Sequence, residues 1–185
     1  MSDALLDDLL PPAQAGEAWA VQAVYEQLAP KVLGYLRIRG AAEPEDLTSE
    51  VFLTVFPKLA SIQGGAAGLR TFTFSVAHAR LVDDLRKRGR REPTVPYEPL
   101  DDPRRTASSE DEAVDNLQSE RVMALLESLR PEQRDVLVMR ILGDLSIEQV
   151  AEALGKSQGA VKQLQRRGLL TLRAALENHP GGVTL

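Results

Sequence analysis

The sequence predicts an all-α protein of two small helical domains joined by an extended acidic linker. Apolar residues recur at three- and four-residue steps over most of the 185 residues, which is the spacing of one helix face. No alternating run of β-branched residues bounded by turns is present. Between two helical stretches, residues 92–116 hold four prolines, and eight acidic against two basic residues, as an extended linker does.

The composition limits the class of protein. Cysteine is absent and the two histidines, His78 and His179, are far apart in the sequence, which excludes a disulfide framework and a Cys/His zinc site. The start, "MSDALLDDLLPP", is acidic where a signal peptide is basic, and no apolar run approaches the roughly 18 residues of a membrane span. We therefore expect a cytoplasmic protein with no cofactor, no metal and no membrane insertion. The expected parts are an N-terminal tail (1–13), a first domain (14–91), the linker (92–116), a second domain (117–178) and a C-terminal tail (179–185).

In the first domain, the residues from Val21 to Leu36 predict a helix, and a second helix begins at Pro44 within 41–59. Glu43, Asp46 and Glu50 share one face of this second helix. Such a triplet suits a protein-docking surface, a solvated edge or metal ligands. Metal is the weakest of the three readings, because no histidine is near.

The segment 69–91 predicts a helix with a buried stripe and a basic end that includes Arg86, Lys87 and Arg88. These cations can hold phosphates, or they can simply complement the helix dipole before the linker. Phe72 and Phe74 can stack on unpaired bases, but aromatic residues at helical spacing are more often core, and we assign Phe74 inward.

The second domain carries the helix-turn-helix pattern. Pro131 opens one helix; Ser146 caps the next, Gly155 supplies the positive φ of a tight turn, and Ser157 caps the last helix. That last helix is expected to bury Val161, Leu164 and Gly168. It leaves amides and cations outward, which suit phosphates and purine edges, although a helical hairpin with a solvated face has the same composition.

Three segments together resemble bacterial sigma factors of the extracytoplasmic-function group in the sigma-70 family. They are "PEDLTSEVFLTVF", "LRTFTFSVAHARLVDDLRKR" and "LRPEQRDVLVMRILGDLSIEQVAEALGKSQGAVKQLQRRGL", in the family's order. The resemblance covers about residues 14–92 and 117–177. It implies a polymerase-binding domain that reads and melts the promoter −10 element (sigma region 2) and a −35 element domain (sigma region 4).

The resemblance also implies partners and site residues. The partners are core RNA polymerase, through the β′ clamp helices and the β flap, then promoter DNA, and an anti-sigma factor. The implied polymerase contacts are Asp46, Leu47, Glu50, Val51 and Phe52. The implied −10 contacts are Gln63, Gly64, Gly65, Arg70, Phe72, Arg80, Arg86, Lys87 and Arg88, with Gln63 to Gly68 as a loop that captures a flipped base. The implied −35 contacts are Ser157, Gln158, Lys162, Gln163, Arg166 and Arg167.

The chain departs from the family pattern at three places. Phe72 stands where tryptophan is common, the loop "QGGAAG" has Gln63 as its only polar side chain, and "VKQLQRRG" places Leu164 one step earlier than "VKSRLHRA". Other functions remain open to the residues alone: an autonomous helix-turn-helix regulator or a protein-binding adaptor. No Ser/His/Asp, Cys/His or paired-carboxylate set can be assembled, so we expect neither catalytic residues nor an enzyme.

Overall fold

The computed structural model describes residues 2–90 and 122–178, and these residues form helices without any strand. The predicted all-α class is confirmed. The predicted linker and C-terminal tail lie outside the described residues. The helices of the first domain are α1 (Ser2–Gln14), α2 (Ala18–Ile38), α3 (Pro44–Val55), the 3₁₀ helix η1 (Phe56–Ser61) and α4 (Gly65–Arg90). Those of the second are α6 (Pro131–Ile141), α7 (Ile147–Leu154) and α8 (Gln158–Asn178), and residues 122–127 are also helical.

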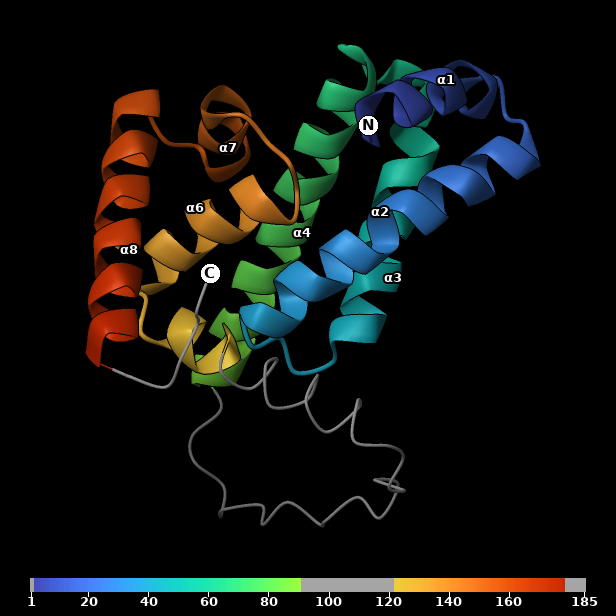
Figure 1. Ribbon diagram of the computed structural model, residues 1–185. Coiled ribbons are helices and arrows are strands. Elements are labelled where there is room, and N and C mark those ends of the chain that lie inside the picture. The colour runs from blue at the N-terminus through green and yellow to red at the C-terminus, as the bar shows by residue number, and fades with distance from the viewer. Residues whose placement is uncertain (1, 91–121, 179–185) are drawn as a thin grey trace, which may run out of the picture.

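Residues 1–13 are not the tail that we expected, because nearly all of them belong to α1. Leu6, Leu9 and Leu10 are buried and pack with α2, α4 and η1. Figure 1 shows α1 lying across the end of the first domain where α4 begins. Asp7 accepts a hydrogen bond from the backbone N–H of Ala66 (2.7 Å), so α1 supplies the acceptor that the first turn of α4 needs. This segment is therefore part of the first domain.

Helices α2, α3 and α4 form the rest of the first domain. Pro44 begins α3 as predicted, and acidic residues occupy its first turn, where the helix dipole favours them. The helix ends at Val55, earlier than the predicted 41–59 segment, because the chain tightens into η1. Phe74 is fully buried and packs edge-to-face on Tyr35 (5.9 Å between ring centroids), which confirms its inward assignment.

The second domain contains the predicted helix-turn-helix, formed by α7 and α8. The Ser146 hydroxyl accepts from the Gln149 N–H (3.2 Å), and the Gln149 amide oxygen accepts from the Ser146 N–H (2.6 Å), a capping box. Gly155 ends α7 in the left-handed region (φ 61°), and the Ser157 hydroxyl accepts from the Ala160 N–H at 3.2 Å. All three predicted turn residues thus have the expected roles.

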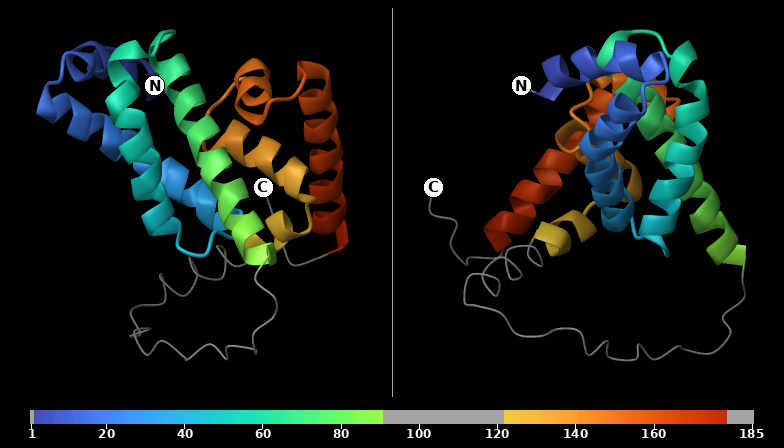
Figure 2. Two further views of the ribbon diagram at one scale, coloured as in Figure 1. Left: turned by 180° about the vertical axis from the view of Figure 1, so that it is seen from behind. Right: turned by 90° about the vertical axis from the view of Figure 1, so that its right-hand side faces the viewer.

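The two domains pack against each other, which the sequence did not predict. Nearly all buried apolar side chains of the described residues form one cluster that runs through both domains. Helix α7 lies beside α4, and both views of Figure 2 keep the second domain against the first. Gly34 and Gly143 allow the contact, because a Cβ at Gly34 would lie 3.2 Å from Leu142, and one at Gly143 would lie 3.0 Å from Phe74.

Among the residues that the structure describes, no helix is both long and apolar enough to span a bilayer.

Candidate nucleic-acid interface

The exposed face of α8 carries the predicted −35 contacts. Val161 and Gly168 are buried and Leu164 is half-buried, so they fix this helix on the rest of the domain. A Cβ at Gly168 would lie 2.8 Å from the end of the Leu137 side chain of α6, so glycine lets α8 pack closely on α6. With that face packed, the opposite face is exposed: Ser157, Gln158, Lys162, Gln163, Arg166 and Arg167. The Ser157 hydroxyl already caps the helix, so the amides and cations are the groups available to DNA.

The predicted base-capture loop is shorter than expected, because α4 begins at Gly65 and only Gln63 and Gly64 precede it. Gly64 and Gly65 have positive φ (83° and 62°). At Gly68 a Cβ would lie 1.8 Å from the Gln63 carbonyl oxygen, so only glycine allows the chain to fold this tightly. The three glycines of "QGGAAG" thus have a backbone role, and Gln63 is the exposed polar side chain.

Two of the predicted −10 contacts lie mainly within the fold. Arg70 is buried at 3% exposure, so it does not present its guanidinium to DNA in this arrangement. Phe72 is half-buried against the core, with the Lys58 ammonium 5.8 Å from its ring centroid. Burial accounts for an aromatic residue at position 72 without any base to stack on, and both −10 assignments stay predictions.

From Arg80 onward the basic side chains of α4 are exposed, and three of these five have acidic neighbours. Arg80 donates to the Thr54 hydroxyl (3.1 Å) and lies 3.9 Å from Glu50, which links α4 to α3. Arg88 pairs with Asp84 (3.0 Å) and donates to the Gly40 carbonyl (2.6 Å). Arg86 lies 3.8 Å from Asp83, and Lys87 is exposed. Such exposed pairs are weak and can exchange for phosphates.

The predicted polymerase-contact helix α3 divides into a surface and a core. Asp46 and Glu50 are exposed, and Leu47 is half-buried. Val51 and Phe52 are core residues at 0% and 2% exposure, so Asp46 and Glu50 are the exposed members of the predicted contact set. Leu53, which sequence reasoning missed, is 75% exposed. Leu53 therefore adds an apolar side chain to the exposed face that carries Asp46 and Glu50. Helical spacing could have found it, because it lies three residues from Glu50.

A buried polar cluster joins the two domains. Asp135 of α6 accepts hydrogen bonds from the Tyr35 hydroxyl (2.8 Å) and from Arg39 Nε (2.5 Å). The Tyr35 hydroxyl also lies 2.9 Å from His78 Nδ1. Burial, together with the Asp135 charge, raises the pKa of Tyr35 well above its usual value. Burial also lowers the pKa of His78, because the charged imidazolium is poorly solvated there, and Asp135 only partly opposes this effect. No pattern in the sequence predicted this pairing.

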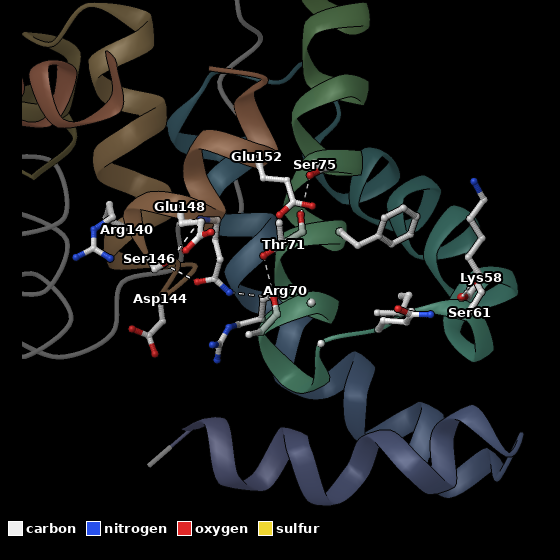
Figure 3. A pocket seen from close by; sticks show the side chains of 17 residues that line it. Lys58, Ser61, Arg70, Thr71, Ser75, Arg140, Asp144, Ser146, Glu148 and Glu152 are labelled. Atoms are coloured by element: carbon white, nitrogen blue, oxygen red, sulfur yellow. Dashed lines mark hydrogen bonds between the residues drawn. The ribbon is translucent and has the colours of Figure 1, made fainter. Parts of the chain in front are cut away.

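A cavity of about 1030 Å³ lies between the domains, beside the base-capture loop. One wall is formed by the loop and the start of α4, and the other by α7 and the turn before it. Figure 3 shows Glu152 of α7 extending toward Thr71 and Ser75 of α4. Glu148 and Asp144 also line the second wall. Within residues 2–90 and 122–178, no group of three Asp, Glu, His or Cys side chains is placed to hold a metal ion.

Comparison with known proteins identifies the family to which the chain belongs. The sigma-70 region 2 family model matches residues 24–91, and the sigma-70 region 4 model matches residues 125–174. The chain is 30% identical over 171 residues to the ECF RNA polymerase sigma factor BldN of Streptomyces coelicolor, covering 91% of this chain and 65% of BldN. It is 32% identical over 177 residues to the ECF RNA polymerase sigma factor SigD of Mycobacterium tuberculosis, covering 91% of this chain and 82% of SigD.

The fold is also that of CnrH, solved in complex with the cytosolic domain of CnrY. The TM-score is 0.66 at 20% identity, over 95% of this chain and 99% of CnrH. Both sigma-70 regions are present in the expected order, and identity to SigD extends over most of both proteins. The chain therefore belongs to the ECF sigma factors, the extracytoplasmic-function group of the sigma-70 family.

Proposed function

We propose that this sigma factor binds core RNA polymerase through the exposed face of α3 and directs it to promoters with its two DNA-facing surfaces. Helix α8 reads the −35 element in the major groove, and the loop at Gln63 with the start of α4 captures and opens the −10 element. The observation that carries this proposal is the α7–α8 helix-turn-helix, whose exposed second helix combines amides with cations.

The charge of the chain supports dependence on the polymerase. Its net charge is −5, and three exposed cations of α4 have acidic neighbours, so counterion release from DNA is modest. Binding to duplex DNA therefore needs additional contacts, and polymerase supplies them. Unstacking a base costs a few kcal/mol, which capture of the flipped base and the surrounding contacts offset. The protein acts in the cytoplasm, where polymerase transcribes.

The test is transcription in a purified system. Core polymerase plus the full chain is expected to give promoter-specific transcripts from a genomic library, while core alone does not. The absence of new transcripts would refute the proposal. Strong duplex binding by the isolated chain in a low-salt gel shift would instead indicate an autonomous regulator.

We further propose an anti-sigma factor as a partner that covers these surfaces. The family resemblance supports this partner, and CnrH is a protein of the same fold that was solved with a bound partner, CnrY. Tagged chain from native cells should retain a protein that blocks transcription by the reconstituted holoenzyme. If every retained protein leaves transcription unchanged, this partner is refuted.

A further inference from the structure

We propose that α1 is a brace for the base-capture loop, in which Asp7 and Gln14 are positioning residues that fix the two ends of the loop. Neither side chain is expected to touch DNA. The inference rests on the proposed function of this loop, because a brace bears on initiation only if the loop binds a base. It assigns α1 a task in promoter opening beyond its part in the core of the first domain.

The base-capture loop has few side chains with which to hold its own shape. Between Ile62 and Ala66 lie Gln63 and two glycines that are in the left-handed region. Glycine loses more conformational entropy than any other residue when the backbone is fixed, so ordering a loop of this composition is costly. A base that binds a disordered loop must overcome that cost on binding. Contacts from outside the loop can order it beforehand.

Helix α1 supplies such contacts at both ends of the loop. At the start of the loop, the Gln14 side-chain amide donates to the carbonyls of Leu59 (3.1 Å) and Ile62 (2.8 Å). At its end, the Asp7 carboxylate accepts from the Ala66 N–H (2.7 Å). Asp7 and Gln14 are two helical turns, or about 10 Å, apart along the same face of α1. One face of α1 therefore spans the whole loop.

The brace is held by the core and leaves the binding side of the loop open. Leu6 and Leu10 are buried and hold the neighbouring face of α1 on the first domain. Both anchors bind backbone groups, whereas the Gln63 side chain stays exposed and lines the cavity beside the loop. At Gly65 a Cβ would lie 2.7 Å from the Asp7 carboxylate, so this glycine admits the anchor. Helix α1 thus fixes the loop backbone without taking the place of a base.

The first measurement concerns the free chain and needs no DNA. Asp7→Ala removes the acceptor at one end of the loop, and Gln14→Met removes the donor at the other while keeping a similar length and helix propensity. NMR relaxation of the double variant should lower the order parameter of the Gly64 N–H from roughly 0.85 to below about 0.6. Asp8→Ala with Gln22→Met makes the same changes at exposed sites of α1 and α2, and should leave the order parameter unchanged. An equally rigid loop in both double variants would refute the brace.

The second measurement uses the holoenzyme and a promoter recovered from transcription of the genomic library. The double variant Asp7→Ala, Gln14→Met should bind a single-stranded oligonucleotide with the non-template −10 sequence about tenfold more weakly, because apparent affinity follows the fraction of loop in its binding shape. Its affinities for core and for double-stranded −35 DNA should stay within about twofold, since these contacts are distant from the loop. General damage to the fold would weaken all three, and equal losses would therefore refute the positioning role.

Single substitutions cover the case in which the double variant loses helicity by circular dichroism. Gln14→Met alone leaves the Asp7 contact in place and should shift both readouts in the same direction by a smaller factor. Asp7→Asn keeps an oxygen that can accept from the Ala66 N–H, so it should bind −10 DNA more tightly than Asp7→Ala. Wild-type values in Gln14→Met, or equal losses in Asp7→Asn and Asp7→Ala, would refute the brace.

Failure of the brace and failure of the proposed function give different results. If the loop does not bind the −10 element, the wild-type holoenzyme itself fails to retain the single-stranded oligonucleotide. That result would overturn the −10 assignment and, with it, the role of α1 in initiation. If only the brace is wrong, the wild-type protein and the Asp7 and Gln14 variants retain the oligonucleotide equally.

Discussion

The two DNA-facing surfaces of this sigma factor differ in how they are built and in how far they are exposed. Helix α8 presents amides and cations on a face that no other described element covers, with Val161 and Gly168 packed on the opposite side. The −10 surface is formed by glycines that close the backbone at Gly68, and α7 lies against it. The proposed −35 surface is therefore exposed in this arrangement, whereas α7 lies close to the proposed −10 surface.

The largest expected effect concerns docking on polymerase. Asp46→Arg with Glu50→Arg reverses two exposed charges of α3 and should weaken binding to core by at least about 100-fold, or about 3 kcal/mol, because like charges across an interface repel. Fluorescence anisotropy of the labelled chain with core measures this affinity. Glu17→Arg with Glu26→Arg makes the same charge change on exposed sites at the start of α2 and in its body. Equal affinity of the two double variants would contradict docking through α3.

A second substitution tests the exposed face of α8 in the second domain. Arg166→Ala should weaken holoenzyme binding to promoter DNA by about 1–3 kcal/mol, because a guanidinium in the groove contacts base edges or phosphate. Arg173→Ala removes the same side chain seven residues later on α8, where it pairs with Glu177 (2.9 Å), and should have little effect. Filter binding of holoenzyme to promoter DNA, at two salt concentrations, measures the affinity of each variant. The −35 assignment fails if both lose affinity equally.

A third pair of substitutions tests whether the tight turn at Gly68 requires glycine. Gly68→Ala should destabilise the protein by about 1–3 kcal/mol, because its Cβ would overlap the Gln63 carbonyl oxygen. Gly89→Ala, on the same helix with open space around it, should be neutral or slightly stabilising. Thermal unfolding followed by circular dichroism compares them, and about 2–4 °C of Tm corresponds to 1 kcal/mol. If Gly68→Ala melts like the wild-type protein, the tight turn is not required.

Substitutions at two nearby positions of α3 distinguish a core side chain from an exposed one. Val51→Ala should lower the free energy of unfolding by about 1–2 kcal/mol through a cavity in the core. Leu53→Ala should leave stability within about 0.5 kcal/mol and weaken binding to core polymerase, since this side chain is exposed. Denaturant unfolding and the anisotropy titration give the two readouts. The opposite pattern would return Val51 to the contact surface.

The smallest expected effect is a pH dependence of the domain contact. Where the two domains pack together, the pKa of His78 is lowered below its usual 6.5 by burial and by the charges of Arg39 and Lys156, while Asp135 opposes them. The separated domains therefore bind more protons, so the domain contact is favoured above pH 6.5 and loses stability as the pH falls below it. The Tm of the chain, followed by circular dichroism, should be lower at pH 5.5 than at pH 7.5. His78→Gln should respond less, and an identical response would exclude His78 as the titrating group.

Much of the second domain could be predicted because its signals are local. A capping serine, a glycine in the left-handed region and a three- and four-residue apolar spacing each depend on neighbouring residues only. The structure of the first domain was harder to predict from the sequence. Residues 1–13 were expected to be a tail, yet nearly all of them lie within α1, whose Asp7 caps a helix almost 60 residues away. The resemblance placed Val51 and Phe52 among the polymerase contacts but could not show their burial, which depends on the helices packed around them.

The sequence alone therefore determined the helical class, the family and the exposed face of α8, because periodicity and turn chemistry act over a few residues. Only the tertiary structure decided that Arg39 meets Asp135, 96 positions apart, and that the acidic face of α7 lies against the −10 loop. Contacts between domains depend on shape and charge assembled from distant segments. No pattern of neighbouring residues therefore predicts which exposed faces of the two domains pack against each other.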